Sequence, residues 1–383
     1  MKNMIKMSLV AAVAVAGLSS NVAATPLTEA IKDVDVSGSV VYRYNDYGDD
    51  NRAGTKDLST NNYKIATSLK SKVNDYVTAT VRVVTGTGIG DNQGTLHNFG
   101  GTDNGKDINP TLQVNQANFT VKTDVATVIA GKQGLTTPWT VAIDSDSNEQ
   151  TGTGLLALVP AGPVTIAAAY FNQTNLDAAH GIIDGDENIA TVGVLGTAGP
   201  VSFDAWYLDM QDSFDSFTVG AKATIEMITA ELRYTSLDLD GTNQPDNNSL
   251  IAKIGAKVGP VGLGFNYGMT DKEGGLTALD SDAKTSLTGW NLNLHNKADA
   301  DMFMLHADMN VMSGLNVAVN YNTIDYGNTS ATETEETELY TQITHTMGKN
   351  LVTYVRFGTF EQEIANDETQ DAITGRLQVE YKF

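Results

Sequence analysis

Three oxygen-bearing side chains at alternating positions, Asp144, Asp146 and Asn148, are spaced as ligands of a metal ion could be. They match the first three liganding positions of a calcium loop, in which oxygen donors surround a hard cation. The remaining positions do not match, because Glu149 stands where such a loop needs glycine and Leu155 where it needs a bidentate glutamate. An EF-hand is therefore excluded, and an oxygen-lined site completed by residues of another loop stays open.

Catalytic motifs are missing from the sequence. It has no HExxH segment, no nucleophile elbow and no Walker motif, and the glycine-rich segment 86–90 lacks the spacing of a dinucleotide-binding loop. The chain has no cysteine and five scattered histidines, so thiolate metal sites and disulfides are excluded. We therefore expect no enzymatic activity and no required cofactor.

Basic side chains within the predicted strands form a second set with chemical meaning. A consistent alternation along the strands turns eight of them toward one face: Arg43, Arg82, Lys132, Lys222, Arg233, Lys253, Arg356 and Arg376. If this face is the inside of a barrel, four of them lie close together, because the first and last strands of a barrel pair. The acids of segment 134–153 would then face these four across the lumen. The alternative is an exposed surface loop and basic residues that are individually solvated.

Alternating apolar and polar residues predict strands along nearly the whole chain. In segment 373–383, Ile373, Leu377 and Phe383 fall on one face, whereas Arg376 and Glu380 fall on the other. Strands of about ten residues have the length that a tilted strand needs to cross a membrane. The terminal phenylalanine also fits an aromatic girdle at the membrane interface. The pattern predicts a transmembrane antiparallel β-barrel.

Short and long connections alternate between these strands, as they do in transmembrane barrels. Three of the short turns contain Gly-Pro, at 162–163, 199–200 and 259–260. The long, polar connections lie near 46–60, 88–110, 134–153, 174–187, 211–215, 239–248, 271–300, 327–336 and 362–370. They imply an all-β barrel of 18 strands. The alternative count is 16, because segment 287–295 is consistent either with a strand or with part of a long loop.

The N-terminal segment 1–24 has the features of a secretory signal peptide, with Lys2 and Lys6, an apolar run at 9–18 and small residues at 22–24. Its apolar run is shorter than the ~20 residues that a membrane-spanning helix needs. Removing this segment leaves 22 basic and 46 acidic residues, a net charge of −24. Such an acidic chain is not expected to bind nucleic acid. Residues 25–383 are predicted to form one barrel domain, since no linker divides them.

Several segments resemble the major outer membrane porin family of campylobacter-like bacteria. Segments 25–38 and 42–44 look like the mature N-terminus of that family, and 124–133 and 142–144, with Trp139 between them, resemble its fifth strand and third loop. The resemblance implies an 18-stranded homotrimer in the outer membrane of a Gram-negative bacterium. It also implies calcium held at the constriction by loop acids, for which Asp144 and Asp146 are the candidates.

The function expected from this resemblance is that of a general diffusion porin, which passes ions and small hydrophilic solutes with some preference for cations. Its constriction would be formed by the inward-folded loop 134–153 and the basic wall: Asp144, Asp146, Glu149, Arg43, Arg82, Lys132 and Arg376. The partners expected are outer-membrane lipid, two further copies of the chain and the permeating solutes. The alternative is a structural outer-membrane barrel or adhesin that acts through its external loops.

Overall fold

The computed structural model of the chain describes residues 34–49, 58–86, 97–98, 111–176, 185–241, 244–327, 333–365 and 367–383. The predicted signal peptide, 1–24, lies outside the described residues.

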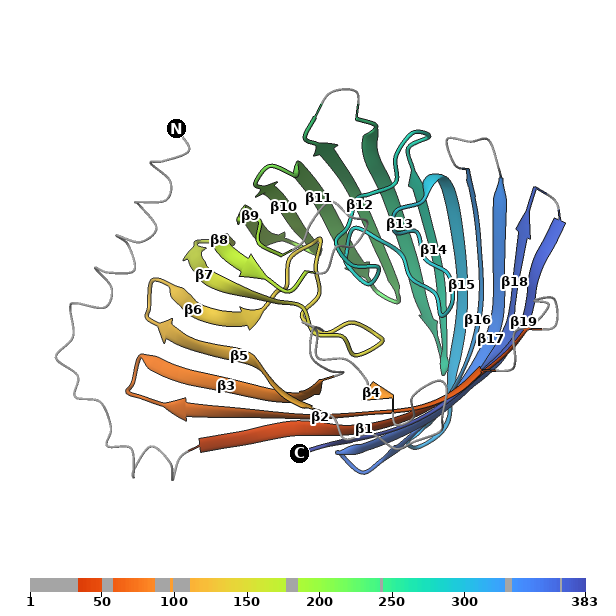
Figure 1. The fold of residues 1–383 in the computed structure, drawn as a ribbon, viewed down its shortest axis with the longest axis horizontal. Helices are drawn as coiled ribbons and strands as arrows, with labels where there is room; N and C mark the ends of the chain where they lie inside the picture. Colours follow the sequence, from red (N-terminus) through yellow and green to blue (C-terminus); the bar gives the residue numbers. More distant parts are fainter. Residues whose placement is uncertain are drawn as a thin grey trace.

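The strands form a single antiparallel sheet that closes on itself (Figure 1). Closure follows from the pairing of β1 with both β2 and β19. The strands are β1 (Val34–Asp49), β2 (Leu58–Lys72), β3 (Val77–Gly86), β4 (His97–Asn98), β5 (Thr111–Lys122), β6 (Thr127–Gly134), β7 (Thr151–Ala161), β8 (Val164–Thr174), β9 (Ile189–Ala198), β10 (Val201–Met210), β11 (Phe214–Ile225), β12 (Ile228–Leu239), β13 (Asp246–Val258), β14 (Val261–Thr270), β15 (Ala298–Met312), β16 (Leu315–Gly327), β17 (Thr334–Met347), β18 (Leu351–Ile364) and β19 (Asp367–Lys382).

Eighteen of these strands make up the barrel wall, because the two-residue β4 only pairs with β2. The predicted all-β antiparallel barrel of 18 strands is therefore confirmed. Segment 287–295 is part of the long connection between β14 and β15, where a single bridge joins Thr288 to Asn293. Within the described ranges, no helix is long and apolar enough to cross a membrane.

Tight turns join the strands at one end of the barrel, and most connections at the other end are longer. The predictions of long connections at 211–215 and 362–370 are wrong, because β11 begins at Phe214, shortly after the end of β10 at Met210, and β19 begins at Asp367, shortly after the end of β18 at Ile364. The predicted Gly-Pro turns lie among the tight turns, and Gly162, Gly199 and Gly259 have φ angles of 65°, 59° and 60°. Such positive φ values are accessible to glycine without a steric penalty. The proline that follows each glycine lies in the turn with a fixed φ, and the next strand begins at the valine after it.

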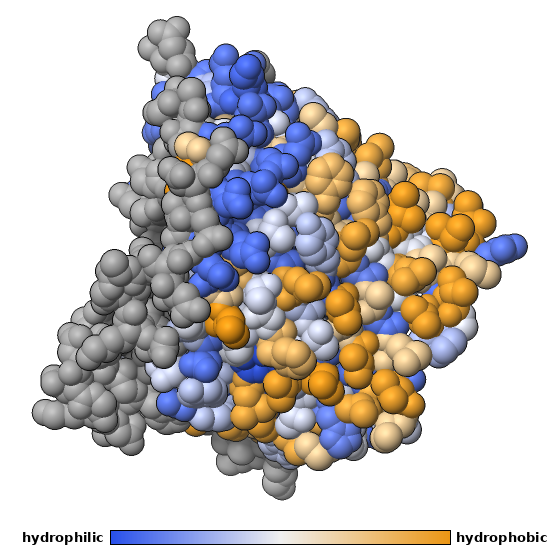
Figure 2. Space-filling view, turned by 90° about the vertical axis from the view of Figure 1, so that its right-hand side faces the viewer, coloured by the Kyte–Doolittle hydropathy of each residue, from blue (hydrophilic) through white to orange (hydrophobic). Residues whose placement is uncertain are grey.

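The two faces of the wall differ as the alternation predicts. Large apolar side chains such as Phe119, Phe217 and Phe357 are exposed on the outer face. Figure 2 shows hydrophobic side chains gathered over the outside of the wall. A soluble protein would bury so much apolar surface, whereas a barrel in a bilayer directs it toward lipid.

The first strand and the last residue fasten the closure of the barrel. The backbone nitrogen of Gly38 donates to the carbonyl oxygen of Phe383 at 2.9 Å, and the nitrogen of Phe383 donates back at 3.1 Å. The ring of Phe383 stacks on Tyr381 with a centroid distance of 6.2 Å. The C-terminal residue therefore completes the hydrogen-bonded ring.

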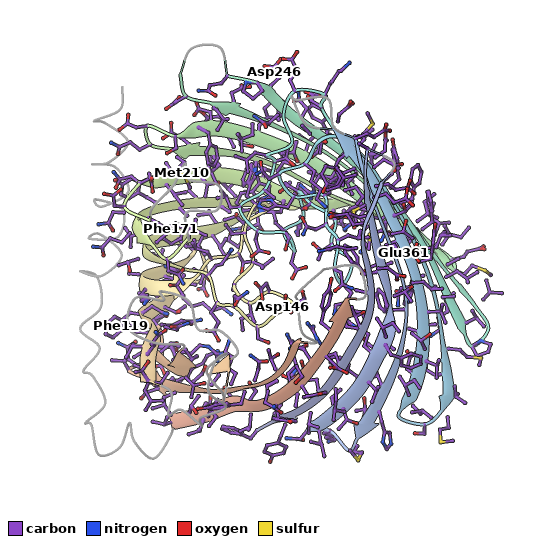
Figure 3. All side chains as sticks on the ribbon, turned by 45° about the vertical axis from the view of Figure 1, so that its right-hand side comes forward. Phe119, Asp146, Phe171, Met210, Asp246 and Glu361 are labelled. Carbon is purple, nitrogen blue, oxygen red and sulfur yellow. The ribbon has the colours of Figure 1, made fainter. Side chains whose placement is uncertain are left out.

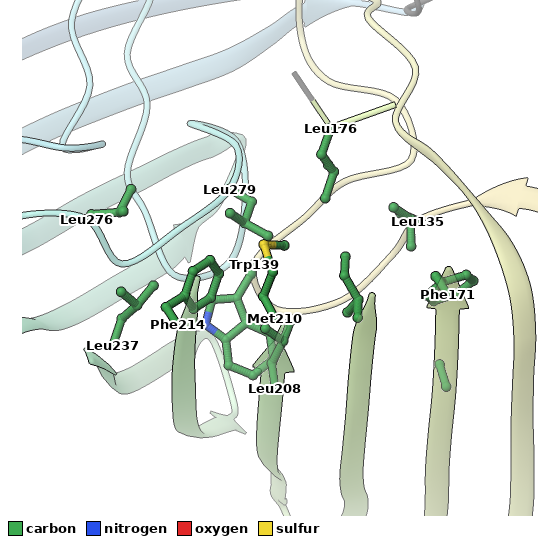
Figure 4. Close-up of a cluster of buried hydrophobic side chains, with 12 residues drawn as sticks. Leu135, Trp139, Phe171, Leu176, Leu208, Met210, Phe214, Leu237, Leu276 and Leu279 are labelled. Carbon is green, nitrogen blue, oxygen red and sulfur yellow. The ribbon is translucent and has the colours of Figure 1, made fainter. Parts of the chain in front are cut away.

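Two of the long connections fold into the barrel rather than away from it (Figure 1). We call residues 135–150 the first inner loop and residues 271–297 the second inner loop. Each loop buries apolar side chains against the inner wall. One cluster includes Leu135, Trp139 and Leu279 (Figure 4), and the other includes Leu287 and Leu294. The apolar core of this protein is thus formed where the inner loops meet the wall.

Candidate functional site

Trp139 fixes the base of the first inner loop inside the barrel. Its side chain is fully buried, and its Nε1 donates to Oγ of Ser216 on β11 at 2.8 Å. Phe214 and Met210, which lie on the same part of the wall, belong to the same apolar cluster (Figure 4). A buried tryptophan combines a large apolar area with one satisfied donor, which favours a single position. The loop therefore extends into the lumen from a rigid base.

Asp144 builds the turn at the tip of this loop. Its carboxylate accepts hydrogen bonds from the backbone nitrogen and the Nδ2 of Asn148, both at 2.7 Å. Ser147, inside the turn, has a φ of 71°. Burial raises the pKa of Asp144, and the bonds from Asn148 oppose that shift. Asp144 thus shapes the turn that directs Asp146 and Glu149 toward the wall.

Glu149 is the buried anion of the first inner loop, with 1% of its side chain exposed. Arg82 donates to both of its oxygens, at 2.8 and 2.6 Å, and the Lys64 ammonium lies at 2.7 Å. Asn115 donates a further bond at 3.2 Å. Burial alone would raise the pKa of Glu149, but Arg82 and Lys64 outweigh burial and hold it below its usual value. Bidentate pairs of this kind are among the strongest in proteins.

Asp146 lies between arginines from the first and last strands. Its Oδ1 is 2.9 Å from Nη1 of Arg43 on β1 and 3.3 Å from Nη1 of Arg376 on β19. The Arg43 side chain is 4% exposed, whereas that of Asp146 is 60% exposed. Figure 3 shows Asp146 inside the barrel. The carboxylate is therefore accessible to solutes in the lumen while two guanidinium groups hold it in place.

The predicted inward orientation of Lys132 is wrong. Lys132 pairs with Ala117, which pairs with Val81, so Lys132 lies on the opposite face of the sheet from Arg82. Its ammonium donates to the carbonyl oxygen of Val114 at 3.0 Å. Both faces of β6 mix apolar and polar residues, with Val128 and Ala130 on the face of Lys132 and Thr127, Ile129 and Gln133 on the other. Alternation alone therefore does not distinguish the two faces of this strand.

Lys64 takes the place in the cluster that Lys132 was expected to fill. Its side chain is 3% exposed, and its ammonium donates to the carbonyl oxygen of Ser147 at 2.6 Å besides contacting Glu149. The signal for it was present in the sequence. Tyr63 and Ile65 flank it as outward residues do, so the alternation of β2 places Lys64 on the inner face.

The second inner loop joins the first through acidic residues, an arrangement that the sequence analysis did not predict. Oδ2 of Asp282 accepts from the backbone nitrogen of Ser145 at 2.6 Å, and Oδ2 of Asp280 accepts from Nε2 of Gln150 at 2.8 Å. Burial, followed by the charges of Asp144 and Asp282, raises the pKa of Asp280 to about 7. The sequence did contain one indication of this inward folding. The polar segment 271–297 includes several leucines, which favour burial over exposure to solvent.

The predicted calcium site is incomplete as these side chains lie. Both oxygens of Asp144 accept bonds from Asn148, and Asp146 faces two arginines. Over the described ranges, no group of three or more acidic, histidine or cysteine residues is placed to hold a metal ion. Arginines in contact with a carboxylate compete with a cation for the same oxygen. We therefore derive no step of the function from a bound metal.

The wall on β10 to β12 carries its own ion pairs. Arg233 contacts Asp204 at 2.7 Å, and Lys222 lies 3.8 Å from Glu231. These side chains and Lys284 of the second inner loop line a cavity of about 480 Å³. This part of the lumen, beside the second inner loop, is therefore not filled by side chains.

Comparison with known proteins places this geometry in a family. The model of the Campylobacter major outer membrane protein family matches residues 1–204. The chain belongs to this family. No curated protein sequence matches it significantly.

The fold of this Campylobacter major outer membrane protein family member is similar to that of solved porins. OccK2 (OpdF) of Pseudomonas aeruginosa has a TM-score of 0.75 at 14% identity, covering 92% of this chain and 98% of that chain. A BenF-like porin from Pseudomonas fluorescens Pf-5 has a TM-score of 0.75 at 14% identity, with coverages of 92% and 99%. OccAB4 of Acinetobacter baumannii has a TM-score of 0.71 at 15% identity, covering 91% of this chain and 98% of that chain.

Family and fold together make the chain an outer-membrane porin of a Gram-negative bacterium. They indicate a channel rather than an enzyme. The charged contacts of the inner loops therefore lie in the lumen of a channel, where they face whatever passes through it.

Proposed function

We propose that this porin is a general diffusion channel for ions and small hydrophilic solutes, with a mild preference for cations. The observation that carries the proposal is the position of Asp146, which extends from the first inner loop into the lumen and is 60% exposed. An accessible carboxylate at a narrow point attracts cations and repels anions.

The balance of charge around Asp146 supports a preference for cations. Lys64 and Arg82 share the buried Glu149, and Arg43 and Arg376 share Asp146. The loop carboxylates Asp144, Asp280 and Asp282 have no ion-pair partner in the part of the chain that the structure describes. With Asp146 and Glu149 they make five carboxylates against four cations, an excess of one negative charge when all five are ionised.

The proposal includes assembly as a homotrimer, which the resemblance to the major outer membrane porin family implies. The measurable consequence is that channels should open in groups of three when one assembly enters a membrane. Single openings of one size would point to a monomeric channel.

Recordings in a planar lipid bilayer test the function directly. The purified protein should conduct in discrete steps, and its reversal potential in a KCl gradient should show a preference for K⁺. Replacing Asp146→Asn should lower that preference, because it removes the exposed carboxylate. Asp75→Asn, in a tight turn at the barrel end, removes the same charge outside the constriction and should leave the preference unchanged. A silent bilayer would instead favour the structural barrel or adhesin.

A further inference from the structure

We propose that the lumen wall beside the second inner loop binds small aromatic carboxylates. Arg356 of β18 would take the carboxylate, and Trp290 of the inner loop would take the ring. The proposal rests on the proposed function only in requiring that solutes enter the lumen.

Arg356 has an unneutralised positive charge. It lies directly opposite Arg376 across the β18–β19 pair. Like charges in this arrangement repel each other. Arg376 shares Asp146 with Arg43, but within the described residues Arg356 forms no ion pair. An anion bound at Arg356 would relieve the repulsion.

The guanidinium of Arg356 has free donors for such an anion. Its Nε donates to Oε1 of Gln342 at 2.8 Å, which fixes the plane of the group. Over the part of the chain that the structure describes, its two terminal nitrogens donate no hydrogen bond. Two parallel N–H donors of one guanidinium match the two oxygens of a carboxylate.

Aromatic rings surround this guanidinium. The centre of the group lies 5.1 Å from the ring centroid of Trp290, 5.2 Å from that of Tyr340 and 5.5 Å from that of Tyr354. Trp290 meets Tyr340 edge to face, with a centroid distance of 5.4 Å. Trp290 and Tyr354 are partly exposed, so a ring entering from the lumen can stack against them.

The backbone of the second inner loop is held so that Trp290 reaches this position. Glu338 of β17, 1% exposed, accepts hydrogen bonds from the backbone nitrogens of Trp290 and Asn291, both at 2.7 Å. It also accepts from Nδ2 of Asn322 at 2.6 Å. A side chain at Gly289 would collide with Oε1 of Glu338. The loop is thus anchored immediately beside the tryptophan.

These features select a ligand by two properties. A carboxylate pairs with the terminal nitrogens of Arg356, and a flat ring gains stacking energy on Trp290 that an aliphatic group lacks. Inorganic phosphate would satisfy the arginine but gain nothing from the rings. Aromatic carboxylates are therefore the class that uses both parts of the site.

Benzoate added to a conducting bilayer tests the proposal. It should interrupt the single-channel current in a saturable, concentration-dependent way, whereas cyclohexanecarboxylate should be weaker by roughly fivefold, the value of one aromatic contact. Inorganic phosphate should also act more weakly than benzoate, because it can pair with Arg356 but gains nothing from the rings. Arg356→Gln should weaken the action of benzoate about tenfold, as expected for the loss of one charge-assisted pair.

Lys222→Gln is the matched control, because it removes a positive charge from another part of the lumen wall. It should leave the action of benzoate unchanged. Tryptophan fluorescence in detergent gives a second measurement, in which benzoate should change the signal of the native protein but not that of Trp290→Phe.

The outcomes separate this proposal from the proposed function. Discrete steps without any effect of benzoate on current or fluorescence would overturn the binding site and leave the channel intact. A saturable fluorescence change without steps would support the site and overturn the channel. Equal effects of benzoate on the native protein and on Arg356→Gln would overturn the site.

Discussion

Glu149 neutralises two cations on the wall, and its environment shows how strongly one residue can be constrained. It is 1% exposed and pairs with Lys64 and Arg82, which are 3% and 13% exposed. Charges removed from water are stable only when each has its partner. A change at this position therefore acts on all three residues.

Replacing Glu149→Gln should destabilise the barrel by about 3 kcal/mol, because it leaves two buried cations without a carboxylate. The measurement is the temperature at which the folded protein in detergent loses its β-sheet circular dichroism. Glu380→Gln is the control, since its partner Lys382 is 64% exposed and exposed pairs contribute little. An unchanged transition temperature for Glu149→Gln would contradict the role of Glu149 as the partner that stabilises Lys64 and Arg82.

Asp280 should make the selectivity of the channel depend on pH. Its pKa is raised to about 7, so the side chain takes up a proton as the pH falls through neutrality. Protonation removes a negative charge from the inner loops, and the preference for K⁺ should therefore decrease from pH 8 to pH 5. Reversal potentials across this range measure the effect. Asp280→Asn should abolish the step near pH 7; a step of equal size in this variant would assign it to another group.

The inward or outward orientation of a side chain can be predicted from the sequence only in strands where apolar and polar residues alternate clearly. Arg43, Arg82 and Arg376 lie in strands whose outer residues are apolar and inner residues polar, so their orientation could be predicted. Lys132 lies in a strand with apolar residues on both faces, and its orientation could not. The partners of Asp144 and Asp146 depend on contacts between distant segments, which no local pattern encodes.

The second inner loop is the element whose position depends most on a few anchors. Glu338 holds its tip to β17 through the backbone nitrogens of Trp290 and Asn291. The leucines on either side, Leu287, Leu292 and Leu294, pack into the apolar cluster at the wall. Mobility of this tip should therefore increase when the anchor is removed.

Replacing Glu338→Ala should expose the loop to protease. The reason is that four donors lose their acceptor, three of them on the loop, so local opening of the loop becomes easier. Trypsin should then cleave after Lys284 about tenfold faster than in the native barrel. Glu361→Ala, an exposed acid on β18, is the control and should leave the cleavage rate unchanged. Equal rates in both variants would show that the leucines alone hold the loop.

The sequence could predict the strands and turns far better than the inner loops. Period-two alternation and Gly-Pro turns such as 162–163 are local features, and they located the barrel strands. The inward folding of residues 271–297 depends on long-range contacts, such as the bond from the backbone nitrogen of Leu279 to the carbonyl oxygen of Trp139 at 2.8 Å. Leu287, Leu292 and Leu294 in that segment are compatible with a strand as well as with a buried loop.

The whole molecule carries a large negative charge, with 46 acidic and 24 basic residues. A field from many distributed charges is sensitive to salt, because the screening length falls from about 10 Å at 0.1 M to about 3 Å at 1 M. The preference of the channel for K⁺ over Cl⁻ should therefore decrease as the KCl concentration rises over this range. Reversal potentials at a constant concentration ratio measure it. A preference independent of salt would indicate direct coordination of the cation instead of a diffuse field.

The contacts of Asp146 also set an order of events in biogenesis. Arg43 belongs to the first strand and Arg376 to the last, and both bind the carboxylate of a loop that lies between them in the chain. These two strands become neighbours only when β1 pairs with β19, so the two arginines meet around this carboxylate only in the closed ring. The constriction can reach its final charge arrangement only after the ring closes, so an unfinished barrel would not have the same ion selectivity as the mature one.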